Sequence, residues 1–574
     1  MNDAAAGDAP RGVSTVGDAA YRSAAKLAPR GAGGEGLLAL AAAVVALLIR
    51  IPFTMDRMWD HDSVQFALGV EKYDLLAHHP HPPGYPLWIG ILKVLAALGI
   101  DPLHGMVALA ILGGAMGTGW MVLLAGRLAP EEARLRTGLF AAALYAFNPL
   151  LWFYGELPLI YALEGGLTVV LAWAATRMEE GRRPFLLACG LFALAGGLRQ
   201  STMVLLAPLL LFGIWRTWRR GRLTPGLFFG GAALGAAVVL SWLVPLCLAA
   251  GGYGAYRRIS TEHFGTLLPQ TSILYGAGWG ALAHNVEVLT KWGLQGIVSG
   301  FVALLVLWIV TPGRIVPGLR WLASRLPWLL AWAVPPVLFF ALFHVTKAGY
   351  TLVHLPALLT AIALAASPAL GAGRGRAVLA TALAIAVGGG LFLFGADRRP
   401  DQPRLWAVVR HEHNRGTLDR FERDLDRTLA VIRRYPPGET VLATVELSGT
   451  GPSGADGFLY PWHRHLQWYL PDYPVLLLVP EESFALVGEG HRPFVREERR
   501  IEVPASTRRI VFVLSEPTGN RLPLGPGRIE RTGEDFYVLT VPFRGELRAG
   551  SLVLTTRTLE IEPDSGSLRR GGEG

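Results

Sequence analysis

Two aspartates, Asp60 and Asp62, stand two residues apart in the segment Trp59-Asp60-His61-Asp62-Ser63. Their side chains would share one side of an extended chain and would diverge on a helix. A carboxylate in such a loop could act as a general base that takes the proton of an acceptor hydroxyl. The alternative is a solvated loop with a helix-capping aspartate, because Asp62-Ser63 precedes an apolar-periodic stretch.

Three histidines follow in the same part of the chain, His78, His79 and His81, directly before the segment Pro82 to Pro86. Clustered histidines can bind a metal, but no cysteine lies at the spacing of a tetrahedral site. Prolines and a glycine at these positions predict a rigid turn. Three roles stay open for the histidines: part of a structural turn, a metal site, or groups that face a phosphate or an acceptor.

A second acidic candidate, Glu156, ends the segment Trp152-Phe153-Tyr154-Gly155-Glu156, and Tyr161 and Glu164 follow soon after. Aromatic residues at the end of a membrane span commonly form an interfacial belt, which is the structural alternative for this segment. Glu164 falls inside an apolar run, where an acidic side chain is a candidate functional residue.

Basic residues between apolar runs are candidates for binding a phosphate. Arg199 and Gln200 lie between two such runs, and a planar guanidinium is well suited to phosphate. An arginine at the end of a span can equally extend its charged end to the membrane surface without a function. Arg257, Arg258 and Lys347 are further basic residues that the topology below predicts on the same face.

Long apolar runs must position these residues. The chain has 574 residues, of which 52% are hydrophobic and 17% charged. Successive apolar runs of about 16–25 residues predict a polytopic α-helical membrane protein, because a helix closes its own backbone hydrogen bonds. The formal charge of +9 is explained by Arg clusters between the runs and does not indicate nucleic acid. Cys189 and Cys247 fall in apolar runs, so we expect neither a disulfide nor a cysteine metal site.

The segment Leu87 to Ile100 decides the topology, because it is short for a bilayer and carries Lys93. If it crossed the membrane, the Arg-rich loops would lie outside, against the positive-inside rule. If it lies flat at the interface, all of those loops are cytoplasmic, and this is the favoured alternative. The Arg-rich loops are Arg127 to Arg136, Arg177 to Arg183, Arg216 to Arg222, Arg314 to Arg325, and Arg374 to Arg376. About eleven spans then result, near 37–54, 106–126, 137–153, 158–176, 184–198, 201–215, 226–249, 295–311, 327–344, 351–367 and 377–395.

The domain organisation follows from these spans. Residues 1–36 are predicted to be a disordered cytoplasmic tail, and 37–395 a transmembrane domain with outer loops at 55–105 and 251–294. Residues 396–564 are predicted to form a soluble extracytoplasmic domain of α/β or β-rich type, followed by a disordered end at 565–574. The predicted strands are Thr440–Val445, Val475–Val479, Arg509–Leu514, Phe536–Val541 and Ser551–Thr555. The predicted location is a bacterial-type inner membrane.

The segment from Met58 to Trp88, named the acidic loop below, resembles the first outer loop of the GT-C superfamily of membrane glycosyltransferases. The resemblance rests on Asp62-Ser63-Val64, on Phe66-Ala67-Leu68, on the turn from His81 to Pro86, and on the aromatic-Tyr-Gly-Glu segment at 152–156. Protein O-mannosyltransferases and lipid A aminoarabinose transferases are the nearest branches, and the resemblance covers roughly residues 37–370.

The resemblance implies a sugar donor carried on a polyprenyl phosphate or diphosphate, and transfer outside the membrane with inversion. It implies that Asp62 is the base, with Asp60 in reserve, and that Arg199, Arg257, Arg258 and Lys347 bind the donor phosphate. The residues expected to line the donor or acceptor pocket are His79, His81, Tyr85, Glu156, Tyr161 and Gln200.

Two departures leave the substrates open. Asp62 is followed by Ser63 and not by a second acid, and the tail has no sugar-binding repeat. The sugar is therefore unspecified, the acceptor is a glycan, a lipid or a protein, and no cofactor is certain. A divalent metal stays open, because some GT-C enzymes need one and others do not.

Three rival functions are kept. A multi-spanning transporter or flippase of lipid-linked or small substrates would favour inverted repeats and helices broken at the middle of the membrane. The two halves of this chain show no such repeat, and a transporter gives no reason for the soluble tail. A polymer ligase with the same chemistry is harder to distinguish, and a non-catalytic scaffold requires that Asp60 and Asp62 be dispensable.

Overall fold

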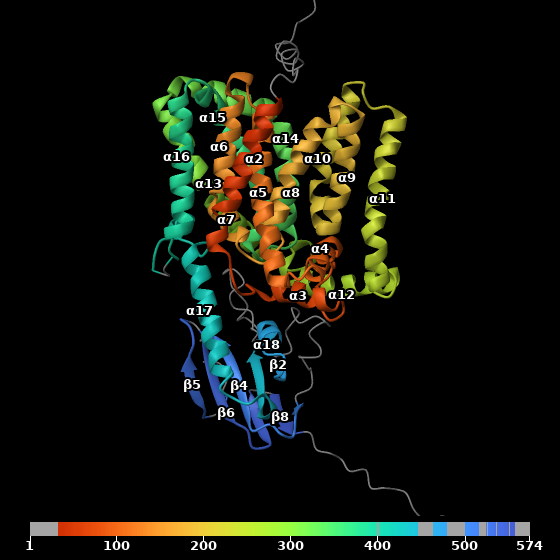
Figure 1. The fold of residues 1–574 in the computed structure, drawn as a ribbon, viewed down its shortest axis with the longest axis vertical. Coiled ribbons are helices and arrows are strands. Elements are labelled where there is room, and N and C mark those ends of the chain that lie inside the picture. Colours follow the sequence, from red (N-terminus) through yellow and green to blue (C-terminus); the bar gives the residue numbers. More distant parts are fainter. Residues whose placement is uncertain are drawn as a thin grey trace, which may run out of the picture.

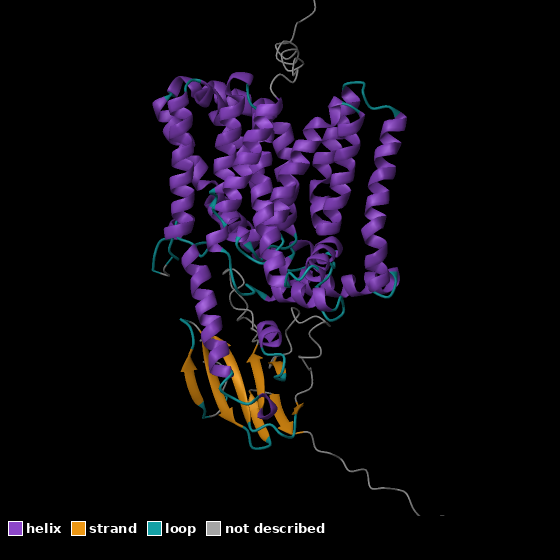
Figure 2. Cartoon of the chain, viewed as in Figure 1, coloured by secondary structure: helices purple, strands orange, loops and turns teal. Residues whose placement is uncertain are grey.

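The computed structural model describes residues 32–398, 401–445, 463–478, 500–515, 524, 526–534, 536–549 and 552–556. A bundle of long helices forms one part of the molecule, and a smaller domain with a sheet lies beyond one end of it (Figure 1). All strands in the described part belong to this smaller domain (Figure 2). The predicted disordered end at 565–574 and residues 1–31 of the predicted tail at 1–36 lie outside the described residues. The rest of that predicted tail was wrong, because helix α2 already begins at Ala32.

The bundle confirms the polytopic helical fold, and each predicted span overlaps one of its helices. Seven helices of the described chain are long and apolar enough to cross a membrane, and the remaining predicted spans correspond to the shorter helices α6, α8, α9 and α15. The bundle helices are α2 (Ala32–Leu48), α5 (Pro102–Leu128), α6 (Arg134–Ala146), α7 (Pro149–Gly155), α8 (Tyr161–Arg177), α9 (Arg182–Leu198), α10 (Gln200–Arg219), α11 (Pro225–Ala249), α13 (Gly278–Val310), α14 (Ile315–Leu342), α15 (Leu355–Gly371) and α16 (Arg374–Phe394).

The predicted span 137–153 is divided between α6 and α7 at Asn148-Pro149. Pro149 lacks the backbone N–H that a helix interior needs but fits the first helical position. The Asn148 side chain accepts hydrogen bonds from the backbone N–H groups of Leu150 (3.1 Å) and Leu151 (3.3 Å), so it caps the new helix.

Short helices gather at the bundle end that faces the smaller domain (Figure 1). They are α3 (His61–Glu71), α4 (Pro86–Ala97) and α12 (Tyr253–Thr271). The Arg-rich loops lie at the opposite end of the bundle (Figure 1). Because α4 stays at the first end, α5 starts from the side where α2 finishes, which agrees with the predicted interfacial helix.

The segment predicted as an outer loop at 251–294 is mostly helical. It contains α12 and the first turns of α13, which starts at Gly278 and runs well before the predicted span at 295. The charged residues of this segment hid the helical pattern, because they sit on helices that leave their polar sides exposed.

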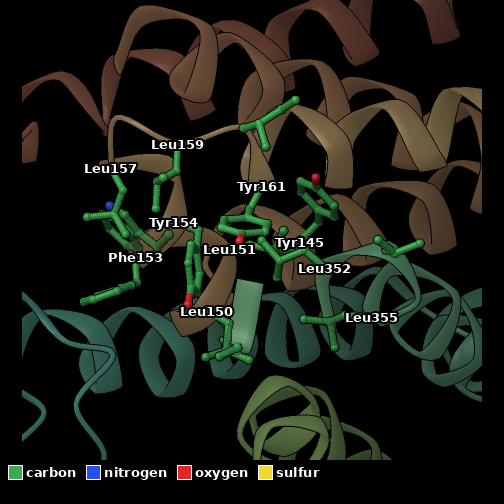
Figure 3. Packing of buried hydrophobic residues seen from close by; sticks show 14 of the residues in the cluster. Tyr145, Leu150, Leu151, Phe153, Tyr154, Leu157, Leu159, Tyr161, Leu352 and Leu355 are labelled. Carbon is green, nitrogen blue, oxygen red and sulfur yellow. The ribbon is translucent and has the colours of Figure 1, made fainter. Parts of the chain in front are cut away.

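Small residues let α5 and α8 pack closely. A Cβ atom built on Gly113 of α5 would meet the backbone of Leu163, and one on Gly166 of α8 would meet the backbone of Gly113. Close backbone approach through small residues is a usual way for membrane helices to associate. Beside this contact, Tyr145, Leu151, Tyr161 and their neighbours form a dense apolar core (Figure 3). The core fixes the start of α8, which carries Glu164.

The smaller domain pairs two helices, α17 (Arg415–Ile432) and α18 (His463–Tyr469), with two sheets. The larger sheet has the order β2-β1-β4-β6-β5, parallel for β2, β1 and β4 and antiparallel beyond β4. The smaller sheet has the order β3-β8-β7. Each of the five predicted strands is present, and β3, β5 and β7 are additional short strands. The strands are β1 (Thr440–Val445), β2 (Val475–Leu478), β3 (Arg500–Val503), β4 (Arg509–Ser515), β5 (Arg528–Arg531), β6 (Phe536–Pro542), β7 (Glu546–Ala549) and β8 (Leu552–Thr556).

Candidate active site

Lys347 joins the two aspartates of the acidic loop. Its Nζ atom lies 2.5 Å from Oδ2 of Asp62 and also forms an ion pair with Oδ2 of Asp60. Lys347 lies in the connection between α14 and α15, just before the short 3₁₀ helix η6 (Ala348–Val353), whereas the aspartates lie at the start of α3. All three side chains are buried, so the loop is a packed site and not the solvated loop of the structural alternative.

Asp60 caps helix α3. Its Oδ1 accepts a hydrogen bond from the Ser63 backbone N–H (3.0 Å), and the Ser63 hydroxyl oxygen accepts one from the Asp60 backbone N–H (3.2 Å). This reciprocal pair is a capping box. The structural alternative of a helix-capping aspartate therefore applies to Asp60 and not to Asp62, because the helix already begins at His61. Asp62 lies in the first turn, and its carboxylate is not needed for the cap.

Two histidines approach the other oxygen of Asp62. Nε2 of His61 lies 3.1 Å from Oδ1 of Asp62, and Nδ1 of His81 lies 3.8 Å from the same oxygen. His81 also bonds to Gln65 through Nδ1 (2.9 Å) and to the Tyr85 hydroxyl through Nε2 (2.9 Å). Burial lowers the pKa of His81 to about 3 and also lowers the pKa of His61, so both rings are neutral at neutral pH.

The charges of this site decide the protonation of Asp62. Burial alone raises the pKa of the Asp62 carboxyl, but the charge of the Lys347 ammonium outweighs burial and holds that pKa well below its usual range. Burial lowers the pKa of Lys347, but the charges of Asp60 and Asp62 outweigh it and raise that pKa well above its usual value. Asp62 is therefore a carboxylate paired with an ammonium.

Arg199 lies in a second buried cluster between α9 and α10. Its Nη1 atom donates to Oε2 of Glu164 at 2.7 Å, and Thr202 bonds to the other oxygen of Glu164. The guanidinium also lies 5.3 Å from the ring centroid of Tyr161 and 4.8 Å from that of Tyr350. The sequence places Arg199 between two apolar runs and shows no partner for its charge. In the structure α8 supplies that partner, the carboxylate of Glu164.

The proline turn connects the two clusters. The Gln200 amide donates to the Pro83 carbonyl oxygen at 3.1 Å, and the Tyr73 hydroxyl donates to the Gly84 carbonyl oxygen at 2.7 Å. Gly84 has a φ of +110°, and a Cβ atom there would lie 2.6 Å from the Tyr73 hydroxyl, so the turn requires glycine. Tyr85 interacts electrostatically with both Arg199 and Asp62. The turn therefore positions Tyr85, whose hydroxyl bonds to the His81 ring that lies beside Asp62.

Side chains of α18 in the smaller domain contact the acidic loop. Arg464 of α18 is fully buried, donates to the Ala77 carbonyl oxygen at 3.1 Å and lies 3.1 Å from Nε2 of His79. The Tyr469 hydroxyl accepts a hydrogen bond from the Met58 backbone N–H at 2.9 Å, and Nε2 of His465 lies 3.1 Å from the Met58 carbonyl oxygen. These residues did not stand out in the sequence. The basic and aromatic composition of His463–Tyr469 was the signal that could have marked them.

Three of the predicted site residues, Arg257, Arg258 and Glu156, have no described contact with the Asp62–Lys347 pair. Arg257 and Arg258 are exposed on α12 and have no ion pair within the described residues, so their phosphate role stays a prediction. Glu156 is fully buried and interacts electrostatically with Arg50, apart from the Asp62–Lys347 pair. The aromatic residues before it are also buried, since Trp152 and its two neighbours pack inside the bundle. The interfacial-belt alternative for that segment was therefore wrong.

The chain is similar to one known protein family and to solved structures of another protein. Residues 74–222 match the family described as Protein O-mannosyl-transferase TMEM260 N-terminal domain. The crystal structure of ArnT from Cupriavidus metallidurans bound to undecaprenyl phosphate is similar over 88% of this chain and 97% of that chain, with a TM-score of 0.51 and 14% identity. The chain has the GT-C fold. The crystal structure of ArnT from Cupriavidus metallidurans in the apo state is also similar. It covers 89% of this chain and 98% of that chain, with a TM-score of 0.51 and 15% identity.

The GT-C fold and the matched family together support a membrane glycosyltransferase, the class that the sequence predicted. A comparison with curated protein sequences gives no significant match. The family match begins after Asp62 and ends before Lys347, so it does not include the central ion pair of the site. Within the described residues of this GT-C fold, no three His, Cys, Asp or Glu side chains are placed to hold a metal ion.

Proposed function

We propose that this protein is an inverting glycosyltransferase that moves a sugar from a polyprenyl phosphate or diphosphate to an acceptor hydroxyl outside the membrane. The observation that carries the proposal is the Asp62 carboxylate, buried beside Lys347 at one end of the bundle. Buried ionisable groups with strongly shifted pKa values concentrate at functional sites. The fold similarity to ArnT, captured with undecaprenyl phosphate, supports a lipid-linked donor.

Asp62 is the better candidate for the base. One oxygen of Asp60 is used by the helix cap and the other by Lys347, so this residue mainly holds the loop. Within the described residues Asp62 makes no such backbone bond, and its Oδ1 lies beside the neutral rings of His61 and His81. A base must reach the proton that it takes, so the proposal requires the acceptor hydroxyl to approach Oδ1 of Asp62.

These roles define one transfer step, in which one bond to the sugar forms and another breaks. Asp62 accepts the proton of the acceptor hydroxyl while that oxygen forms a bond to the anomeric carbon of the sugar. The bond between the anomeric carbon and the phosphate oxygen breaks on the opposite face, and its electron pair leaves with the polyprenyl phosphate. Arg199 and Lys347 are the buried cations that would stabilise the charge of this leaving group. No step of the proposal passes through a metal.

Lys347 has a second role in the proposal. While its ammonium is bound to Asp62, the carboxylate is a weak base, because the pair favours the ionised form. A donor phosphate that approaches Lys347 offers a competing anion. The base would then become stronger when the donor is bound, which limits proton transfer to the loaded site.

The finer assignments belong to the same proposal. The family match to an O-mannosyltransferase domain supports a protein hydroxyl among the glycan, lipid and protein acceptors. The concentration of Arg-rich loops at one bundle end supports a multi-pass location in a bacterial-type inner membrane, with the smaller domain outside. Arg257, Arg258, His79 and Gln200 are kept as residues near the donor or acceptor path.

The test uses purified full-length protein and a sugar-labelled polyprenyl-phosphate donor. The proposal expects release of free polyprenyl phosphate that depends on an added acceptor, and loss of this release in Asp62→Asn. Movement of the intact labelled donor between leaflets of a vesicle, without release of polyprenyl phosphate, would instead support the flippase alternative.

A further inference from the structure

A cavity of about 260 Å³ opens between the end of α8 and the start of α9. This end of the bundle is opposite the end at which α3 lies (Figure 1). Its lining consists of Trp173, Ala174, Arg177, Arg183, Pro184 and Leu187. Sites for drug-sized ligands occupy roughly 300–1,000 Å³, so this cavity has room for a small group and not for a whole large ligand. It lies far from the residues of the proposed transfer reaction.

The charges around the cavity favour an anion. Each acid of the connection between α8 and α9 already pairs with arginines outside the cavity lining. Glu180 lies 2.7 Å from Arg127 as well as 2.8 Å from Arg177, and Glu179 lies 3.0 Å from Arg220. Arg177 also lies over the ring of Trp173, at 4.6 Å from its centroid. Arg183 is exposed, and no acidic side chain in the described part of the chain pairs with it. The cavity therefore has one arginine oriented by its neighbours and one whose charge is uncompensated.

An apolar surface continues from the cavity along α9. Leu187 lines the cavity and is 51% exposed, and Leu194, two turns further along the same helix, is 42% exposed. Residues two turns apart lie on about the same helix face. An anion bound at Arg183 could therefore carry an apolar chain that lies against these leucines.

We propose that this cavity binds the phosphate group of an anionic phospholipid in the leaflet opposite the candidate active site. Basic pockets between membrane helices are known to bind anionic headgroups. The two arginines take the phosphate oxygens, Trp173 contributes an aromatic residue at the depth of the headgroups, and one acyl chain covers Leu187 and Leu194. The inference is independent of the proposed transfer reaction.

The experiment measures lipid retained by the full-length protein after purification in mild detergent with phosphatidylglycerol and phosphatidylcholine in equal amounts. Native mass spectrometry counts the bound lipids. Arg183→Gln is expected to lower phosphatidylglycerol retention by about fivefold, the effect of one arginine near an anionic lipid surface. The matched control is Arg182→Gln, because Arg182 is also exposed but does not line the cavity, and lipid retention by this variant should equal that of the wild type.

Three results would overturn the inference. Equal loss in both variants would show a diffuse attraction of lipid to the basic surface, and unchanged retention in both would show no site. A further arm adds inorganic phosphate to lipid-free protein. Stabilisation of the wild type by inorganic phosphate to the same melting temperature as phosphatidylglycerol, with loss of both effects in Arg183→Gln, would identify a free-anion site and reject the lipid.

Discussion

The ammonium of Lys347 lies 2.5 Å from a carboxylate oxygen of Asp62, although 285 residues separate the two in the sequence. Asp62 belongs to the first turn of α3, and Lys347 belongs to the connection that follows α14. Neither residue is exposed, so water screens the pair poorly. The protonation of the proposed base is therefore controlled by a residue from the other half of the membrane domain.

The first prediction concerns pH. In the wild type, Lys347 keeps the pKa of Asp62 below its usual range, so the carboxylate stays ionised as the pH falls. In Lys347→Gln the ammonium is gone and burial raises that pKa. The acidic limb of the profile of kcat/KM against pH is expected to move to higher pH by about 1–3 units. Lys347→Arg retains the charge and should leave the limb near its wild-type position.

An acidic limb that stays in place in Lys347→Gln would mean that another group sets it. Donor binding is measured in the same variants, because loss of a phosphate contact lowers donor affinity without moving the limb.

The second prediction separates the two aspartates. Asp62→Asn keeps the shape and removes the base, so turnover is expected to fall by at least about a hundredfold while donor binding is retained. Asp60→Asn should cost less, because asparagine caps a helix about as well as aspartate does. Single-turnover transfer assays on both variants decide the assignment. A larger loss in Asp60→Asn would make Asp60 the base.

The third prediction tests whether Arg199 binds the donor or only neutralises Glu164. Arg199→Ala leaves Glu164 buried and unpaired, which should cost about 3–5 kcal/mol of stability, together with donor affinity. The double variant Arg199→Ala/Glu164→Gln removes the stranded charge and should regain most of the stability. If donor affinity returns as well, Arg199 has only a structural role. Denaturation curves and KM for the donor provide the two measurements.

The fourth prediction concerns the smaller domain. Arg464→Ala removes the buried contacts to Ala77 and His79, and kcat is expected to fall roughly ten- to hundredfold, as for a hydrogen bond from a charged group. Donor affinity should change little, because Arg464 acts on the position of the loop. The control is Arg434→Ala, since Arg434 forms an exposed ion pair with Glu530 and should be replaceable without effect. Comparable kcat values in the two variants would argue against this positioning role.

The fifth prediction concerns topology. Reporter fusions placed after Glu131 and after Pro437, both at exposed positions, are expected to report opposite sides of the membrane. The expectation follows from the Arg-rich loops at one bundle end and the smaller domain at the other. A cytoplasmic signal from both fusions would contradict the proposed orientation.

The sequence predicted those features that local pattern determines. Long apolar runs predicted the helices, alternating β-branched segments predicted the five main strands, and the prolines around Gly84 predicted the turn. Acids and histidines are unusual beside membrane spans, and this composition marked the Asp62 segment as a candidate site. All of these signals lie within windows of about a helix or a strand in length.

Features that depend on contacts between distant segments were not predicted. The Arg199–Glu164 pair joins α8 to the start of α10, and no periodicity links the two. The aromatic segment at Trp152 was assigned to the interface because side chains that face lipid and side chains that face other helices are equally apolar. Arg464 and Tyr469 lie in a short helix whose role is visible only from what it touches.

The contact between Met58 and Tyr469 spans 411 residues, and it has a consequence for the order in which the protein is made. The acidic loop leaves the ribosome early, after a single span, whereas its supports on α18 are synthesised after all the spans. During most of synthesis, Asp62 has neither Lys347 nor the smaller domain beside it. A chain that stops after α16 would carry the Asp62 segment without its contacts to α18, so the proposed site is complete only after the last part of the chain has been made and has docked.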